Sequence, residues 1–257
     1  MSIYKKLAFA TVAALSLLQM GAYAEQAHGA AHWSYDEGDS APAHWASLSE
    51  YFATCDAGKQ QSPVDIADAI TIKAELPSLQ LDYKPISFDM VNNGHTVRIT
   101  PDNAGTLTIG EDSYQLWQFH FHTPSEEAIN GKHADMVIHI VHRSAENKLA
   151  VIAVLLEKGE VANPLIDTLW KVMPKMSGEP QAHDSQIDIN QLLPEDKSYY
   201  TLWGSLTTPP CSEGVRWIIL KQPVSISAEQ LAQFQAVYSH NNRPIQPLNN
   251  RWVLSSD

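Results

Sequence analysis

The chain has 257 residues, of which 44% are hydrophobic, and it carries a formal net charge of −12 at pH 7. Its length suits one large domain or two small ones, and its hydrophobic fraction is that of a globular protein with a substantial core. Because proteins bind nucleic acids and anionic membranes through basic patches, the acidic balance argues against both kinds of partner.

The first 24 residues have the pattern of a secretory signal peptide. Two early lysines precede an apolar stretch over residues 7–20, and Ala22-Tyr23-Ala24 fits the small-x-small cleavage rule. The alternative is an uncleaved membrane anchor, but the apolar stretch is short for a bilayer span and contains polar residues. We therefore expect cleavage after residue 24, which leaves residues 25–257 as one periplasmic or secreted domain without membrane contact.

The spacing of apolar residues predicts a chain made mostly of strands. A short helix is expected over Trp45–Phe52, and helical patterns recur after Asn163-Pro164 and after the capping box of Ser227 and Gln230. Elsewhere a period of two predicts strands over residues 79–83, 86–90, 95–100, 107–109, 114–122, 136–142, 149–156 and 215–220. No repeat, linker or change of composition divides the chain, so we predict a single, mainly β domain with a few peripheral short helices.

Cys55 and Cys211 are the two cysteines of the chain. In an exported protein two distant cysteines favour one disulfide, whereas in the cytosol they would be buried thiols. We therefore predict a Cys55–Cys211 bridge, which would tie the start of the fold to the segment just after Thr207-Thr208-Pro209-Pro210.

Residues 118–122 are the starting point for a metal site. On a strand, Gln118, His120 and His122 share one face, while the two phenylalanines between them face the core. Two imidazoles two residues apart on a rigid strand can converge on one metal ion. A His-x-His pair is also commonly a solvated or hydrogen-bonded pair, so the rest of the chain has to supply a third ligand.

A catalytic zinc takes three protein ligands and keeps a fourth position for water. The strand predicted over residues 136–142 offers His139 and His142, which lie on opposite faces because they are three residues apart. We favour His139, since a buried imidazole in mid-strand needs a metal or a hydrogen-bond partner. His142 is expected at the strand end, satisfied by solvent or a carboxylate. His95 follows a tight turn, where an accessible imidazole would be a natural proton carrier.

Several motifs together resemble the α-class carbonic anhydrases, in particular exported bacterial members. In chain order they are Gln61-Ser62-Pro63-Val64-Asp65-Ile66, Asn93-Gly94-His95, Gln118 with His120-Phe121-His122, His139, Ser205-Leu206-Thr207-Thr208-Pro209-Pro210-Cys211 and Asn241-Asn242-Arg243-Pro244. The resemblance implies a twisted, mostly antiparallel sheet of about ten strands. It also implies reversible hydration of CO2 to bicarbonate and a proton, by attack of zinc hydroxide on CO2 with a histidine proton shuttle.

The resemblance assigns roles in zinc binding and proton transfer. The residues that match the zinc site are the ligands His120, His122 and His139 and their supporting partners Gln118 and Asn241. The residues that match the proton path are the shuttle His95 and the water-ordering Tyr35 and Asn93. Sulfonamides and anions are expected as inhibitors, and a homodimer is common in this branch although no residue here requires one.

The resemblance also assigns a substrate site. Thr207 would accept a hydrogen bond from the zinc hydroxide, oriented by the carboxylate of Glu126, and its backbone N–H, next to Thr208, would meet the substrate. The residues that match the apolar CO2 pocket are Val141, Val151, Leu206, Val215 and Trp217. For these five apolar residues a plain core position is an equal alternative. The resemblance further makes Ser62-Pro63 and Pro209-Pro210 candidates for cis peptide bonds.

Three positions near the third zinc ligand depart from the family pattern. The family usually supports that histidine with a Glu two residues earlier, a position that is Val137 here. Glu127 stands where the family has His, and Leu202 where it has Tyr. Because the three family residues form one hydrogen-bonded cluster, we expect a coordinated change in which Glu127 supplies His139 with the carboxylate that Val137 cannot.

Arg98 is a further departure, at a position where the family often has a neutral polar residue. Strict alternation places Arg98 on the opposite face from His95, and a bulge would bring it into the active-site cavity. There, its charge would lower the pKa of the His95 imidazole.

Three other functions fit parts of the sequence. An inactive binding module of the same fold is disfavoured by the three histidines together with Thr207 and Glu126. A different zinc hydrolase, such as an esterase, would use the same hydroxide, so esterase activity alone would not discriminate. A structural or adhesive exported β-protein would leave the polar face of residues 118–122 unexplained.

Overall fold

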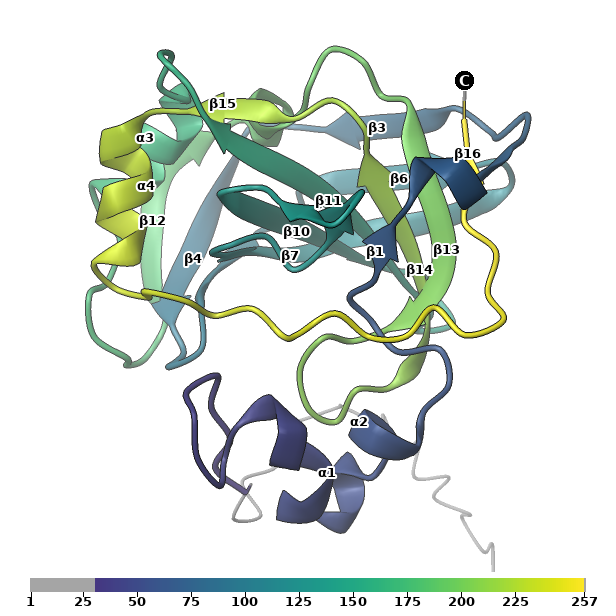
Figure 1. The fold of residues 1–257 in the computed structure, drawn as a ribbon. Coiled ribbons are helices and arrows are strands. Elements are labelled where there is room, and N and C mark those ends of the chain that lie inside the picture. The colour runs from purple at the N-terminus through teal and green to yellow at the C-terminus, as the bar shows by residue number, and fades with distance from the viewer. Residues whose placement is uncertain (1–30, 257) are drawn as a thin grey trace, which may run out of the picture. The chain divides into compact units, whose positions relative to one another are not determined.

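A computed structural model describes residues 31–256, so the predicted signal peptide lies outside the described residues. None of the helices in that part of the chain has both the length and the apolar character needed to cross a membrane. Strands dominate the described chain, as predicted, and the helices are short and lie at the periphery of a large twisted sheet (Figure 1).

The main sheet has thirteen strands, most of which follow one another in an unbroken hydrogen-bonded order. Across the sheet, this order is β12 (Gln181–Ile187), β4 (Ile86–Asn92), β5 (Val97–Pro101), β7 (Asp112–His122), β10 (Met136–Arg143), β11 (Leu149–Lys158), β14 (Glu213–Leu220), β13 (Tyr199–Ser205), β16 (Leu254–Ser255) and β2 (Ile72–Lys73). The remaining three strands are β3 (Leu79–Tyr83), β6 (Gly105–Ile109) and β15 (Val224–Ile226). Most pairs are antiparallel, and the parallel pairs are β11 with β14, β11 with β15, and β16 with β2. The predicted twisted, mostly antiparallel sheet is therefore confirmed.

The strands β7, β10 and β11 lie at the centre of this sheet. Alternate residues of β10 enter two separate apolar clusters: Ile138 and Ile140 belong to the larger core cluster, and Val137 and Val141 belong to the smaller one. Every residue from Met136 to His142 is buried. Both faces of β10 are thus covered, which explains why its sequence is almost continuously apolar.

A second, three-stranded sheet lies beside the main one. It consists of β1 (Asp65–Ile66), β8 (Ala128–Ile129) and β9 (Lys132–His133), with β1 parallel to β8 and β8 antiparallel to β9. The short segment between β7 and β8 therefore connects the central strand of the main sheet with the small sheet.

The two longer helices begin where their N-terminal capping residues predict. In α3 (Pro164–Trp170) the Asn163 side chain accepts hydrogen bonds from the first backbone amides, and α4 (Ala228–Gln235) begins with the predicted capping box. The two helices pack together, because the Trp170 indole N–H donates to the carbonyl oxygen of Gln230 at 2.9 Å. The Trp170 ring also lies 4.8 Å from that of Phe121, so the helices cover the core face of β7.

The predicted helix over Trp45–Phe52 is wrong as a single element. It is divided into α1 (Trp45–Leu48) and a 3₁₀ turn, Glu50–Phe52, and α2 (Thr54–Ala57) follows. Ser49 has extended backbone angles and its hydroxyl accepts a hydrogen bond from the Tyr51 amide, which ends one helix and caps the next. Three further 3₁₀ turns are Pro42–His44, Asp68–Ile70 and Ile189–Leu192.

The predicted disulfide is present, and it joins Cys55 in α2 to Cys211 across 156 positions of the chain. The cis bonds predicted at Ser62-Pro63 and Pro209-Pro210 are confirmed, and Thr123-Pro124 is also cis. Sequence patterns did not predict β12 or β13, which extend the sheet beyond β4 and β14.

Candidate metal centre

Three histidines from two neighbouring strands converge at the centre of the sheet. β7 carries His120 and His122, and β10 carries His139 directly opposite His120 in the antiparallel register. One ring nitrogen of each histidine lies within 4.8 Å of the others, a separation at which the three could hold one metal ion. The structure therefore brings together the three residues that the sequence selected, and β7 presents two of them because it alternates with a period of two.

The outward ring nitrogen of each histidine has a hydrogen-bond acceptor. The acceptors are Gln118 Oε1 for His120 Nδ1 (2.8 Å), the Asn241 carbonyl oxygen for His122 Nδ1 (2.6 Å) and Glu127 Oε1 for His139 Nε2 (3.0 Å). A neutral imidazole has one N–H and one lone pair, so each of these bonds places the lone pair on the other nitrogen. Three lone pairs therefore point to a common place.

The donor set fits a metal ion such as zinc. His122 Nε2 is buried and has no hydrogen-bond partner in the described part of the chain, and such an atom normally requires one. Burial, followed by the charge of His139, lowers the pKa of the His122 imidazole far below its ordinary value, and burial and both neighbouring histidines do the same for His120. Both rings are thus held in the neutral form that binds metals.

His139 has a different electrostatic environment. Burial alone would lower its pKa, but the nearby carboxylates of Glu127 and Glu126 reverse this and raise it. Glu127 is 2% exposed, and its two oxygens lie 3.0 and 3.3 Å from His139 Nε2. The contact expected between Glu127 and His139 is therefore present in the structure.

Glu126 is fully buried on the inner side of the three histidines. Its Oε2 lies 3.6 Å from His122 Nε2 and 3.8 Å from His139 Nδ1, and its Oε1 accepts the Arg243 backbone N–H at 2.8 Å. Burial raises the pKa of this carboxyl to about 7, against the lowering effect of His139 and of hydrogen bonds from Arg243 and the Thr207 side chain. The structure thus places Glu126 beside Thr207, as the resemblance implies.

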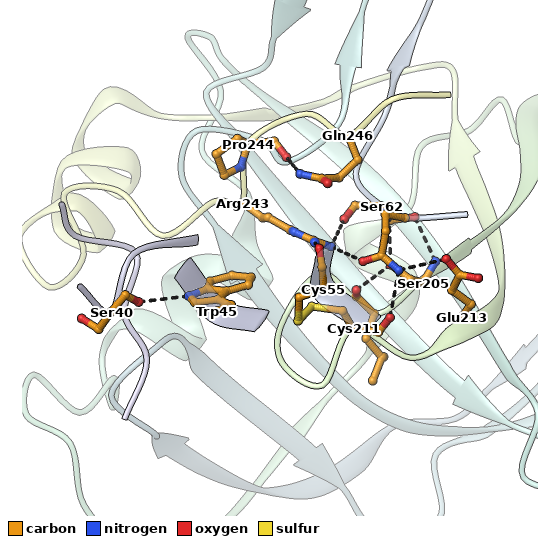
Figure 2. Close-up of a disulfide and its surroundings, with 12 residues drawn as sticks. Ser40, Trp45, Cys55, Ser62, Ser205, Cys211, Glu213, Arg243, Pro244 and Gln246 are labelled. Atoms are coloured by element: carbon orange, nitrogen blue, oxygen red, sulfur yellow. Dashed lines mark hydrogen bonds between the residues drawn. A yellow bond between two sulfur atoms is a disulfide. The ribbon is translucent and has the colours of Figure 1, made fainter. Parts of the chain in front are cut away.

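The loop that carries Thr207 is anchored at both ends. Leu206 N donates to the carbonyl of Ser212 at 2.9 Å, and Cys211 N donates to that of Thr208 at 2.8 Å. At the end of the loop lies the disulfide, next to the buried Arg243 (Figure 2). The Arg243 guanidinium donates to Cys55 O, Ser62 O and Gln61 Oε1, each at 2.8 to 2.9 Å.

Arg243 is a residue whose role the sequence did not reveal. Its side chain holds the disulfide region, while its backbone N–H holds Glu126, so one residue connects the Thr207 loop with the carboxylate that faces Thr207. The Asn-Asn-Arg-Pro motif was visible, but the acceptors of the guanidinium are mostly backbone carbonyls, which leave no sequence signal.

The residues predicted as an apolar pocket pack side by side. Val141, Val151, Val215 and Trp217 belong to the smaller core cluster, and Leu206 packs against it. Strand register explains the grouping, because Val151 pairs with both Val141 on β10 and Trp217 on β14. The Trp217 ring lies 4.8 Å from the His139 ring, so this apolar cluster adjoins the three histidines.

His95 lies in the turn before β5 and stacks on an aromatic ring. The His95 and Trp33 rings are 3.6 Å apart and nearly parallel, at 8°. Burial, and the charge of His32, lower the pKa of His95 to about 4. Its backbone carbonyl accepts a hydrogen bond from the Asn241 side chain, the same residue whose carbonyl supports His122. No sequence pattern paired Trp33 with His95, because the contact joins two segments far apart in the chain.

The two residues expected to order water near His95 have other contacts as well. The Asn93 side-chain oxygen accepts the backbone N–H groups of His95 and Thr96, so it forms the turn itself. The Tyr35 ring lies 6.4 Å from that of His122, and burial, reinforced by Glu126, raises the pKa of its hydroxyl well above the ordinary value. Tyr35 is thus close to His122 of the candidate metal centre, and its hydroxyl is neutral.

Two expectations about neighbouring residues are corrected. His142 is fully buried, not solvated at a strand end: a bulge between Val141 and His142 shifts the register, and the ring nitrogen Nε2 lies 2.6 Å from the Tyr83 hydroxyl. Arg98 pairs directly with His120 across β5 and β7, so it lies on the histidine face. Its charge lowers the pKa of His120, whereas the low pKa of His95 comes from burial and His32.

Comparison with known proteins identifies what this arrangement is similar to. The model of the eukaryotic-type carbonic anhydrase family matches residues 40–257. A carbonic anhydrase of Klebsiella pneumoniae is 44% identical over 248 residues, covering 95% of this chain and 97% of that protein, and one of Pectobacterium atrosepticum is 42% identical over 241 residues, covering 93% and 97%. The solved α-carbonic anhydrase of Thermovibrio ammonificans, in complex with the inhibitor sulfanilamide, superposes with a TM-score of 0.84 at 44% identity, covering 87% of this chain and 99% of that one.

Proposed function

The chain belongs to the eukaryotic-type carbonic anhydrase family, and we propose that it hydrates CO2 reversibly at a zinc ion held by His120, His122 and His139. One observation carries the zinc assignment. Each ring nitrogen that faces outward has a hydrogen-bond acceptor, so the three lone pairs that remain converge within 4.8 Å. Three imidazoles without a thiolate are the ligand set of a catalytic zinc rather than of a structural one.

Zinc bound by three histidines lowers the pKa of a coordinated water to about 7, an effect for which carbonic anhydrase is itself the standard example. The residues around the histidines then decide how the reaction proceeds. Thr207, oriented by the carboxylate of Glu126, accepts a hydrogen bond from the nucleophile and so aims its lone pair at the substrate. The Thr207 backbone N–H, with Thr208 beside it, meets the developing oxygen charge.

The apolar residues beside His139 form the proposed binding place of CO2. Val141, Val151, Leu206, Val215 and Trp217 expose no hydrogen-bonding group there other than the indole N–H of Trp217, and that group donates to the Ser205 carbonyl at 3.0 Å. An apolar surface suits a small molecule without charge, and it favours release of the charged bicarbonate product. The substrate thus lies next to the ion without competing for its ligand position.

We propose His95 as the group that carries the proton to solvent. It is partly exposed, and its backbone is tied to Asn241, which also supports His122. Stacked on Trp33, with a pKa of about 4, His95 accepts a proton only weakly at neutral pH. In this proposal the His95 ring leaves Trp33 for a more hydrated position when it takes the proton, with Tyr35 beside His122 at the start of the path and Asn93 beside His95 at its end.

The family also supports proposals on inhibitors and location. Because the Thermovibrio relative binds sulfanilamide, sulfonamides and small anions should inhibit this protein too. An exported, periplasmic or secreted protein is supported by the signal pattern over residues 1–24 and by the Cys55–Cys211 disulfide. A homodimer stays a prediction.

The zinc assignment is tested by metal content together with CO2 hydration, before and after chelation. The oxidised protein should hold one zinc per chain and lose both zinc and hydration in a strong chelator, and zinc should restore both. His139→Ala should hold little zinc and hydrate CO2 at least 100-fold more slowly, while His44→Ala, at an exposed histidine outside the site, should match the wild type. A folded wild-type protein that hydrates CO2 without zinc would refute the assignment.

A further inference from the structure

We propose that the orientation of His139 is set from the small sheet, by Glu127, and that Glu127 is the positioning residue for the third zinc ligand of this chain. This inference rests on the proposed zinc function. Glu127 immediately precedes β8 of the small sheet, whereas His139 lies in the middle of β10 of the main sheet, so the carboxylate and the imidazole that it supports come from different segments of the chain.

The contact between the two side chains is close and dry. Both Glu127 oxygens lie within 3.3 Å of His139 Nε2, and the two residues are 2% and 1% exposed. A carboxylate can only accept at that nitrogen, so the neutral ring carries its proton on Nε2 and its lone pair on Nδ1. Nδ1 is the atom that faces Glu126 Oε2 and the other two histidines. Glu127 thus selects both the tautomer and the direction of the ring.

The strand that carries His139 cannot supply this acceptor itself. Residues two apart on a strand share a face, so Val137, two residues before His139 on β10, lies on the same face as the His139 ring. Val137 is fully buried in the smaller apolar cluster, to which the buried Leu202 also belongs. Neither side chain can accept a hydrogen bond, so the acceptor has to come from another segment, and among the described residues Glu127 supplies it.

A clamp at Ser125 fixes the backbone of Glu127. The Ser125 hydroxyl donates to the Glu127 carbonyl at 2.6 Å and accepts the Ala134 backbone N–H at 2.9 Å, while the Ser125 backbone N–H donates to the Ala134 carbonyl at 3.0 Å. These three bonds hold the segment before β8 against the segment that leads into β10. The distance from the Glu127 backbone to His139 is therefore set by structure and does not depend on a mobile loop.

The test moves the carboxylate between the two sheets. Glu127→Ala removes it, Glu127→Gln keeps the size and an acceptor oxygen, and the double variant Glu127→Ala/Val137→Glu places a carboxylate on β10 in the volume that Glu127 leaves. Glu157→Ala, at an exposed glutamate of β11, is the matched control. Two readouts are used: the rate of zinc release to a chelator, and the protonated ring nitrogen of His139 from nitrogen-15 NMR of the zinc-free protein.

The expected pattern is specific to a positioning role. Glu127→Ala should release zinc about 10–100-fold faster and show a mixture of His139 tautomers, Glu127→Gln should lie between it and the wild type, and the double variant should recover the Nε2–H form and slow release. Glu157→Ala should be unchanged. If folded Glu127→Ala and Glu127→Gln keep the wild-type tautomer and release rate, the inference is overturned. Because the tautomer is measured without zinc, this measurement would still test the role of Glu127 if the protein proved not to bind zinc.

Discussion

Removal of the Cys55–Cys211 bridge should lower the free energy of unfolding substantially without changing the fold. The bridge closes a loop across 156 positions of the chain. In the chain-entropy model, closing a loop of this length lowers the conformational entropy of the unfolded state and so raises its free energy by about 5 kcal/mol. This value is an upper limit, because residual structure in the unfolded chain reduces it. The variant Cys55→Ala/Cys211→Ala should therefore lose about 3–5 kcal/mol.

The loss is measured by guanidinium chloride unfolding at neutral pH, with chelator present so that metal binding does not contribute to stability. The dependence of the unfolding free energy on denaturant should become steeper in the variant, because the unfolded chain without a cross-link exposes more surface. Wild-type protein treated with a reductant should behave like the variant, which controls for the two alanines. A loss below 1 kcal/mol with an unchanged slope would show that the bridge does not restrict the unfolded state as argued.

Three further predictions follow from contacts around the site. Tyr83→Phe leaves the buried Nε2 of His142 without its partner at 2.6 Å and should lower the unfolding free energy by about 1–3 kcal/mol; equal stability would show that the bond contributes nothing net. Because the pKa of His95 is lowered to about 4, the contribution of His95 to the free energy of unfolding is complete above pH 6.5 and is lost as the pH falls towards 4. Trp33→Ala should raise the His95 pKa, measured by NMR, and flatten this pH dependence. An unchanged His95 pKa would rule out burial by Trp33 as its cause. Zinc at 100 times its dissociation constant should raise the unfolding free energy of the wild type by about 2.7 kcal/mol and leave that of His139→Ala unchanged, as measured by thermal unfolding. A wild type that zinc does not stabilise would argue against zinc binding to the folded state.

The central strands could be predicted from the sequence because a hydrophobic core dictates their pattern. β7 alternates between the histidine face and the Phe119 and Phe121 face, and β10 is apolar throughout because both its faces are covered. β12 gives no such signal: it is polar, mostly exposed and held to β4 through backbone pairing at the edge of the sheet. β13 is buried at nearly every position, so its sequence has no period of two to detect.

The site was predictable where side chains alone decide it and not where the backbone does. The alternation of side chains along the strands predicts His120, His122 and His139 as ligands. The hydrogen-bond acceptor for His122, however, is the main-chain carbonyl of Asn241, which a pattern of side chains cannot predict. The position of His142 at a strand end was misleading for a related reason. The residues that follow it in sequence are partly or fully exposed, but Tyr83, from a strand 59 residues earlier, contacts the ring through its hydroxyl.

The distribution of unsatisfied groups supports a functional origin for this arrangement. Within residues 31–256, five buried side-chain atoms have no hydrogen-bond partner, and two of them, His122 Nε2 and Glu126 Oε2, lie 3.6 Å apart at the same site. Buried polar atoms in native proteins normally have a hydrogen-bond partner, so two without one at the same place point to a site that a ligand completes. Sequences that otherwise agree with their fold at every level depart from it mainly at functional sites. The two groups are an imidazole lone pair and a carboxylate oxygen, the pair of atoms that a cation and an ordered hydroxyl would satisfy together.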